Sequence, residues 1–188
     1  TEMVNLSERS LRDIGLTSNF ARLVMFLGHG SNCLNNPHES AYHCGACSGS
    51  AGGANARALA AMLNDVRVRR QLKERGLEIP EETYFIGGLH NTGSEEITFF
   101  DLELLPTSHV RSLRLARDLF SRVAERNAHE RCRRFESAPL DLTAAEALLH
   151  VQERTEDLAQ TRPEYGNCTN AMCFVGRRSR IRGLYLDR

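Results

Sequence analysis

Several side chains that can bind a metal ion lie close together in the first quarter of the sequence. They are His29, Cys33, His38, His43, Cys44 and Cys47. Zinc prefers imidazole nitrogen and thiolate sulfur as ligands, so this composition points first to a zinc site. A closed structural zinc site usually shows two Cys-x2-Cys pairs, and only Cys44-Gly45-Ala46-Cys47 forms such a pair here. The spacing therefore leaves a partial, catalytic zinc site open and gives little support to a zinc finger.

Two other chemistries use the same segment. Cys44 and Cys47 have the spacing of a thioredoxin-like dithiol, but that motif directly follows a strand, and the strand predicted here ends at Gly28. The run from Ser48 to Arg57 (SGSAGGANAR) could instead present amide groups at a helix N-terminus to a small anion such as bicarbonate or phosphate. Tight packing of the helix start explains these glycines equally well. Nucleotide binding is disfavoured, because neither G-x-G-x-x-G nor a Walker lysine is present.

The elements that must hold these residues follow from the hydropathy pattern. Strands alternating with helices predict an α/β fold with a mainly parallel sheet flanked by helices, in which ligands bind at the carboxyl ends of the strands. His29 follows one strand end, and His90 and Asn91 end a second strand, so these three residues are expected at the same edge. The predicted strands are 21–28, 83–92, 96–104, 170–176 and 181–187, and the predicted helices are 7–14, 54–75, 106–126 and 143–160.

Particular residues carry expectations within these elements. Ser7 is the expected N-cap of the first helix, and Gly76 is expected to end the second. Five apolar residues of the third helix are expected to face the core: Val110, Leu113, Leu115, Leu119 and Val123. His109, His129 and His150 are expected to face solvent.

Composition limits the function classes. Lysine and arginine total 24 and aspartate and glutamate total 24, which gives no electrostatic footprint for nucleic acid. No apolar run is long enough to span a bilayer. The length suits a single α/β domain, with an N-terminal helix (1–20), a strand-loop-helix part with the site (21–105), a helical segment (106–162) and late strands (163–188). The abrupt ends lead us to expect a fragment of a longer protein.

A set of motifs in order resembles one family. They are GHGS, NNPHESAYHCGAC, GGANARALAAMLNDVRVRRQL, GLEIPEETYFIGGLHNT, QTRPEYG and NAMCFVGRRS. From about Leu11 onward the sequence is similar to the C-terminal half of the catalytic portion of DabA, the large soluble subunit of an inorganic carbon (CO2 and bicarbonate) accumulation system. The resemblance implies half of a fold like that of the β-carbonic anhydrases.

The resemblance also implies zinc (Zn2+) as cofactor and CO2 hydration to bicarbonate as the reaction. The family's ligands are Cys, Asp, His and Cys, and the last two match His29 and Cys44. Cys47, Gly45 and Ser48 would then form the pocket wall, with His90 and Asn91 as further pocket candidates. The implied partner is a DabB-like proton-conducting membrane subunit, which would place the protein peripherally at the cytoplasmic side of the membrane.

One departure from the family pattern limits these expectations. The first two ligands come from a Cys-x-Asp-x-Arg segment, and no such segment occurs in these 188 residues. The chain would therefore supply half of the zinc site and, alone, bind zinc weakly and lack hydratase activity. The rival hypotheses are a non-catalytic α/β assembly domain and a redox protein that uses Cys44 and Cys47.

Overall fold

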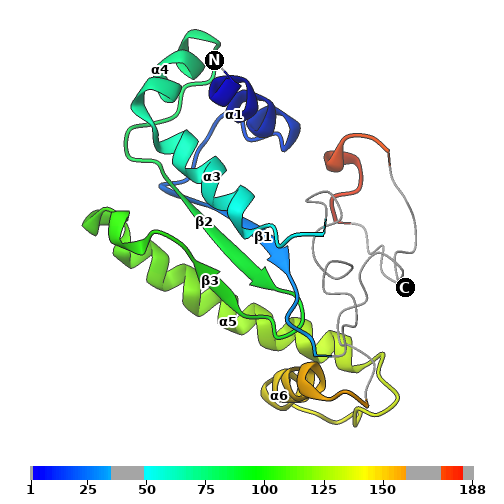
Figure 1. The fold of residues 1–188 in the computed structure, drawn as a ribbon. Coiled ribbons are helices and arrows are strands. Elements are labelled where there is room, and N and C mark those ends of the chain that lie inside the picture. The colour runs from blue at the N-terminus through cyan, green and yellow to red at the C-terminus, as the bar shows by residue number, and fades with distance from the viewer. Residues whose placement is uncertain (1, 35–48, 160–174, 184–188) are drawn as a thin grey trace.

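A three-stranded sheet, in the order β1-β2-β3, is the centre of the computed structural model (Figure 1). The structure describes residues 2–34, 49–159 and 175–183. β1 (Leu23–Gly30) pairs in parallel with β2 (Tyr84–Asn91), and β2 pairs antiparallel with β3 (Ile97–Phe99). The predicted α/β fold is confirmed, but in the described ranges only one of the two strand pairings is parallel.

Two helices, α3 (Gly53–Asn64) and α4 (Val66–Glu74), lie between β1 and β2 in the chain. The single helix predicted over 54–75 is thus divided. The cause is Asp65, whose backbone is extended (ψ 121°) and whose side chain accepts a hydrogen bond from the Arg67 amide, so that it caps α4. Gly76 follows α4 with a φ of +80°, and the prediction that this glycine ends the helix is confirmed.

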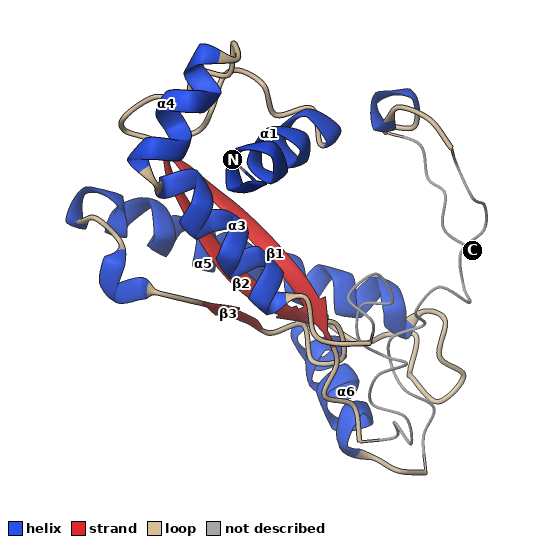
Figure 2. Cartoon of the chain, turned by 45° about the horizontal axis from the view of Figure 1, so that its top comes forward, coloured by secondary structure: helices blue, strands red, loops and turns tan. Residues whose placement is uncertain are grey.

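The sheet is covered on both faces, which Figure 2 shows with α3 on one side and α5 (Val110–Cys132) on the other. On the first face α1 (Glu2–Asp13), α3 and α4 pack around Phe85. On the second face Leu113 of α5 packs against Ile86 and Phe99. A smaller core joins the end of α5 to α6 (Ala144–Glu156). Three short 3-10 helices complete the described elements: Leu102–Leu104, Thr107–His109 and Arg178–Arg180.

Several predictions about single residues are wrong. Ser7 is fully buried in the middle of α1, because the helix begins at Glu2. His109 is also buried, with Nε2 2.8 Å from the Glu82 carbonyl oxygen and 3.1 Å from that of Arg22. His129 and His150 are partly buried, and the His150 ring lies 6.3 Å from that of Phe135.

The predicted buried face of α5 is only partly correct. Leu113 is buried, but the exposed fractions of Leu115, Leu119 and Val123 are 61%, 53% and 50%, and Val110 is 43% exposed. The helix reaches the sheet through Leu113 and Phe120, and it reaches α6 through Ala128 and Cys132, which are spaced differently from the predicted face.

The two strands predicted near the C-terminus, 170–176 and 181–187, are absent from the parts of them that the structure describes. Over residues 175–183 the structure has the 3-10 helix Arg178–Arg180 and turns, with no strand, and the rest of both predicted strands lies outside the described residues.

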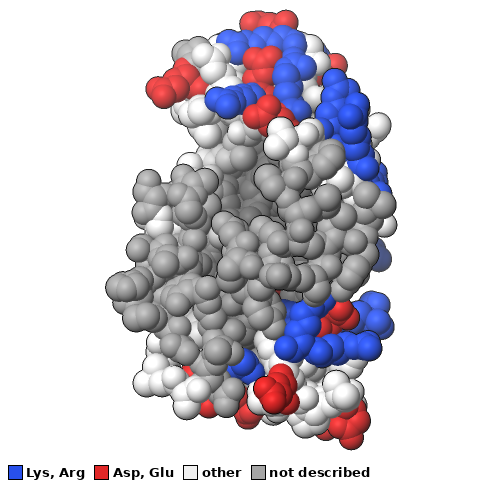
Figure 3. Space-filling model, turned by 90° about the vertical axis from the view of Figure 1, so that its right-hand side faces the viewer, with Lys and Arg blue, Asp and Glu red and all other residues white. Residues whose placement is uncertain are grey.

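Charges of both signs are interspersed where α1 meets α4, at the top of the face in Figure 3. Glu8 of α1 pairs with Arg75, which follows α4, at 2.8 Å, and with Arg12 at 3.0 Å. Arg12 also donates to the Arg75 carbonyl oxygen at 3.0 Å. These contacts hold the first helix against the crossover, the connection from β1 to β2 that contains α3 and α4.

Among the helices that the structure describes, none is both long and apolar enough to cross a membrane.

Candidate functional site

His29 and His90 lie side by side at the carboxyl end of the parallel strand pair. They are partners in the register of β1 and β2, directly before the partners Gly30 and Asn91. Side chains alternate along a strand, so both rings lie on the face that carries Leu23 and Ile86, which is the face packed against α5. The structure therefore brings these two predicted site residues together. The predicted strand ended at Gly28, whereas β1 continues to Gly30, so His29 is held by strand pairing rather than by a loop.

The start of α3 packs tightly against this end of the sheet. A Cβ on Gly28 would come 2.1 Å from the carbonyl carbon of Gly52, and a Cβ on Gly87 would come 2.6 Å from the Cα of Arg57. The Gly52 amide donates to the His29 carbonyl oxygen at 2.8 Å. Close backbone packing therefore accounts for glycine at these positions.

The N-terminus of α3 also has an electrostatic consequence for the site. Its N-cap is Gly52, without a side-chain cap, and its first turn contains no acidic residue. No carboxylate in the first turn of α3 therefore neutralises the partial positive charge of this helix end, which lies next to the His29 backbone.

A buried carboxylate holds His90 from the other side. Glu95 follows β2 with a φ of +66°, and its side chain is only 4% exposed. Its Oε2 lies 2.9 Å from Nε2 of His90, while its Oε1 accepts from Asn127 Nδ2 at 2.5 Å and from the Arg131 guanidinium. Burial raises the pKa of Glu95, but the hydrogen bond from His90 and the charge of Arg131 outweigh it, so the net pKa is lowered. Glu95 is therefore ionised near neutral pH and links the end of β2 to α5.

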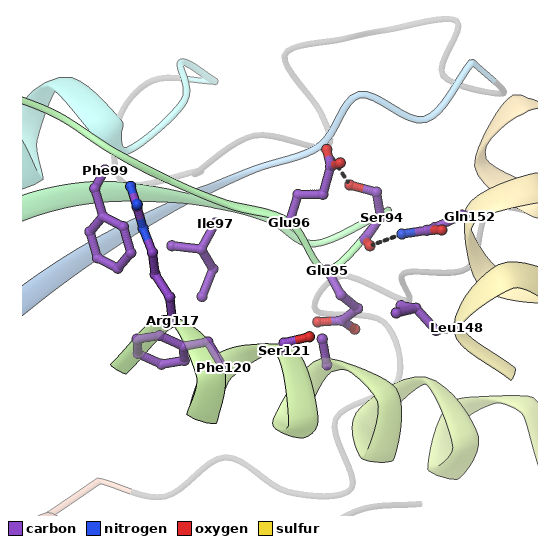
Figure 4. Close-up of a pocket in the computed structure, with 11 residues that line it drawn as sticks. Ser94, Glu95, Glu96, Ile97, Phe99, Arg117, Phe120, Ser121, Leu148 and Gln152 are labelled. Carbon is purple, nitrogen blue, oxygen red and sulfur yellow. Dashed lines mark hydrogen bonds between the residues drawn. The ribbon is translucent and has the colours of Figure 1, made fainter. Parts of the chain in front are cut away.

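A cavity of about 400 Å³ lies between β3, α5 and α6, and Glu95 forms part of its wall (Figure 4). The Arg117 guanidinium lies over the Phe99 ring at 5.8 Å, and Gln152 donates to the Ser94 carbonyl oxygen at 3.4 Å. His29 is not among the residues that line the cavity. This cavity is thus separate from His29 and His90, although Glu95 both lines the cavity and contacts His90.

Asn91 has a structural role at this edge. Its Nδ2 donates to Asn32 Oδ1 at 2.5 Å, and its Oδ1 accepts from the amides of Gly93 (3.1 Å) and Asn32 (3.4 Å). Two residues later the Leu34 amide donates to the Thr155 carbonyl oxygen at 2.7 Å. The chain that leaves β1 is thereby fixed to β2 and α6 before it enters the segment with the candidate thiols.

The other predicted site residues, Cys44, Gly45, Cys47 and Ser48, lie outside the described residues, as do His38 and His43. Cys33 is buried at 3% exposure beside Ser31. Within the ranges that the structure covers, no group of three or more His, Cys, Asp or Glu side chains could hold a metal ion. His29 nevertheless fits as one zinc ligand, because it is an exposed imidazole on a rigid strand end, and a Cys thiolate would complement it.

Sequence reasoning missed Glu95 altogether. Glu95 and Glu96 are adjacent carboxylates in one turn, and nothing in the local sequence distinguishes them. Only the fold shows that Glu95 turns toward α5, whereas Glu96 lies 3.3 Å from the Ser94 hydroxyl (Figure 4).

Comparisons with known proteins agree with the sequence motifs. Residues 1–188 match the model of a family described as "Probable inorganic carbon transporter subunit DabA". A relative of that description (DabA 2) from Rhodopirellula baltica is 58% identical over all of this chain, which covers 17% of the relative. Others from Sorangium cellulosum (DabA 2) and Parafrankia are 54% and 48% identical over 95% and 100% of the chain. The chain spans 17–18% of these three proteins. No solved structure matches it significantly.

Proposed function

Since this chain belongs to the DabA family, we propose that it forms half of a zinc site at which CO2 is hydrated to bicarbonate during inorganic carbon uptake. The observation that supports this proposal best is the position of His29. It is an exposed imidazole at the carboxyl end of a parallel strand pair, and its backbone oxygen accepts a hydrogen bond from Gly52 at the start of α3. Ligands bind at this edge in α/β proteins.

His29 would bind zinc through an imidazole nitrogen, and Cys44 would bind it through thiolate sulfur. By the family resemblance, the other two ligands are a Cys and an Asp from a segment that is not in this sequence. When bound, zinc would lower the pKa of a coordinated water toward about 7, which supplies a nucleophile for CO2 at neutral pH. The chain's own residues hold and shape this site.

Three features of the described chain would serve that reaction. Strand pairing from Leu23 to Gly30 fixes the backbone of His29, so the ligand needs no rearrangement to bind. The glycines at Gly28 and Gly52 allow α3 to begin directly beside it. The positive end of α3 lies next to the His29 backbone, on the face of the sheet opposite the imidazole, and across the end of the strand it would favour a negatively charged product, which bicarbonate is and CO2 is not.

The wider setting of the reaction is part of the same proposal. We propose that the complete protein acts at the cytoplasmic side of the membrane, as a peripheral partner of a DabB-like proton-conducting subunit. The description of each relative as a transporter subunit supports the part of this proposal that the protein acts in a complex of several subunits. Coupling to proton flow would make hydration effectively one-way and would trap bicarbonate inside the cell.

Zinc analysis of the freshly purified complete protein tests the ligand assignment. We expect about one zinc per chain in the wild type and a loss of most of it in both His29→Ala and Cys44→Ser, since each removes a ligand. Matched controls are His129→Asn and Cys47→Ser, which should keep their zinc. Zinc content that is unchanged by Cys44→Ser would contradict the assignment and favour a non-catalytic assembly domain.

Thiol titration addresses the redox alternative. A zinc-bound Cys44 should not form a disulfide with Cys47 under mild oxidant, and mass spectrometry should find both residues as thiols. Rapid, reversible formation of a Cys44–Cys47 disulfide in the metal-loaded protein would instead support a redox function.

A further inference from the structure

The α5 helix carries a stripe of large apolar side chains that the sheet does not cover. Leu115, Leu119 and Val123 are spaced four residues apart, so they follow one another along the same side of the helix. Their exposed fractions are 61%, 53% and 50%, whereas Leu113 and Phe120 lie on another side and pack against the sheet. The helix is therefore apolar on two sides, which is typical of a helix that lies between two layers of structure.

The exposed residues of the other helices differ from this stripe. The α3 helix covers the other face of the sheet (Figure 2), and its exposed residues are alanine, asparagine and arginine. On α6, Leu149 is 55% exposed, but the residues three and four positions away from it are alanine, glutamine and two glutamates. A single exposed leucine of this kind needs no partner. The stripe on α5 is instead a continuous apolar surface.

Positive charge lies beside the stripe. From Val110 to Arg126 the helix has five arginines against one aspartate and one glutamate. Arg111, Arg122 and Arg126 are exposed and lie three or four residues from members of the stripe. None of these three is in an ion pair with the part of the chain that the structure describes. A complementary partner is therefore apolar in its middle and acidic at its edge.

The stripe also ends at a hollow that a partner can enter. Arg122 and Arg126 line a cavity of about 590 Å³ between the second half of α5 and the start of α6, together with Leu142. Rows of side chains spaced four residues apart on one helix pack into the grooves of a second helix. The shape of this surface thus favours a helical partner.

Two facts favour a segment of the same polypeptide as that partner. This chain spans 17–18% of the three relatives named above, so more than four-fifths of such a protein lies outside these residues. The stripe is roughly 12 Å long at 1.5 Å per residue, far less than the roughly 800 Å² per partner that a stable complex of separate proteins buries. A tethered segment needs less contact, because its effective concentration is high.

We propose that the outer side of α5, defined by Leu115, Leu119 and Val123, binds an amphipathic helix from the part of the same polypeptide outside residues 1–188. Apolar side chains of that helix cover the stripe, and its Asp or Glu side chains pair with the neighbouring arginines. The α5 helix is then the middle layer between the sheet and this second helix. The proposal does not require zinc at His29, so its failure and that of the proposed function are independent.

Photo-cross-linking in the complete protein identifies the partner. Benzoylphenylalanine in place of Leu119 is compared with the same photo-reactive residue in place of Leu149, the single exposed leucine of α6. We expect a cross-link at position 119 that leaves the protein at the mass of one chain in a denaturing gel. Mass spectrometry should find the linked peptide outside residues 1–188, with apolar residues beside Asp or Glu. The yield at position 149 should be lower by about fivefold or more.

Hydrogen exchange measures what the contact contributes to the stability of α5. Leu119→Ser removes apolar surface from the stripe, so exchange in peptides that cover residues 110–126 of the complete protein should become about 5- to 30-fold faster. Leu149→Ser is the matched control, because it is the same substitution at nearly the same exposure. Exchange in α6 of that variant should stay within about twofold of the wild type.

Other results overturn the proposal. A cross-link between two chains of this protein would make the outer side of α5 an interface between copies. A cross-link to a separate subunit, or to a basic segment of the same polypeptide, would equally exclude the partner that we propose. Equal yields at positions 119 and 149, or equal exchange in Leu119→Ser and the wild type, would show that the stripe is exposed to solvent in the complete protein.

Discussion

A single methyl group at Gly28 should displace the start of α3 and disturb the site beside it. The Cβ of Gly28→Ala would lie 2.1 Å from both the carbonyl carbon and the carbonyl oxygen of Gly52. Ordinary contacts between such atoms are about 3.5 Å, so the helix start or the strand must move by more than about 1 Å. The obstacle is backbone on both sides, and no side-chain rotation can relieve it. The hydrogen bond from the Gly52 amide to the His29 carbonyl oxygen, now 2.8 Å, would be stretched or broken.

Overpacking of this kind costs about 1–3 kcal/mol, which corresponds to a rise of roughly 5- to 150-fold in the local opening equilibrium. Hydrogen exchange measured by mass spectrometry on the complete protein reports that opening for the peptides that contain residues 52–57. Ala61→Ser is the matched control, because it adds one heavy atom to the exposed side of the same helix. Exchange in Gly28→Ala that stays within twofold of the wild type would refute the claim that α3 is fixed by this contact.

Two further predictions concern the crossover. Arg69 donates to the carbonyl oxygens of Leu63 (2.7 Å) and Thr83 (2.6 Å). Arg69→Met should therefore lower the local free energy of unfolding by about 2–4 kcal/mol, measured as faster hydrogen exchange at the start of β2. Unchanged hydrogen exchange would show that water replaces the guanidinium. Hydrogen bonds from the side chain and amide of Arg67 hold the pKa of Asp65 at about 2, below the usual 3.8. Because this pKa is depressed on folding, the charged cap stabilises α4 above about pH 4, and its contribution disappears as the pH falls toward 2. The melting temperatures of wild type and Asp65→Asn should therefore converge over that range, and a constant difference would contradict the assignment.

The alternation of strands and helices could be predicted from the sequence, because buried parallel strands and amphipathic helices leave distinct hydropathy patterns. β1, β2 and the end of α4 at Gly76 were found in this way. The division at Asp65 was missed because an aspartate inside a helical pattern can face solvent or cap a new helix, and the choice depends on tertiary packing. The exposed Leu115, Leu119 and Val123 were misplaced for a similar reason, since periodicity identifies an apolar face but not what covers it.

In the candidate site, residues at strand ends could also be predicted from the sequence, whereas residues whose partners are distant in the chain could not. His29 and His90 could be placed at one edge because parallel strands align their carboxyl ends. Glu95 could not be found, since its significance depends on Asn127 and Arg131, which are 32 and 36 residues away in the chain. The buried His109 was missed likewise, because its partners are carbonyl groups at the starts of two strands.

X-ray absorption at the zinc edge of the complete protein tests the central claim most directly. A site with His29, Cys44 and the Cys and Asp of the missing segment would show two sulfur ligands at about 2.3 Å and nitrogen or oxygen ligands near 2.0–2.2 Å. In Cys44→Ser the sulfur shell of any remaining zinc should fall from two atoms to one. A wild-type spectrum without sulfur, or a sulfur shell unchanged by Cys44→Ser, would contradict the proposal that this chain supplies half of the site.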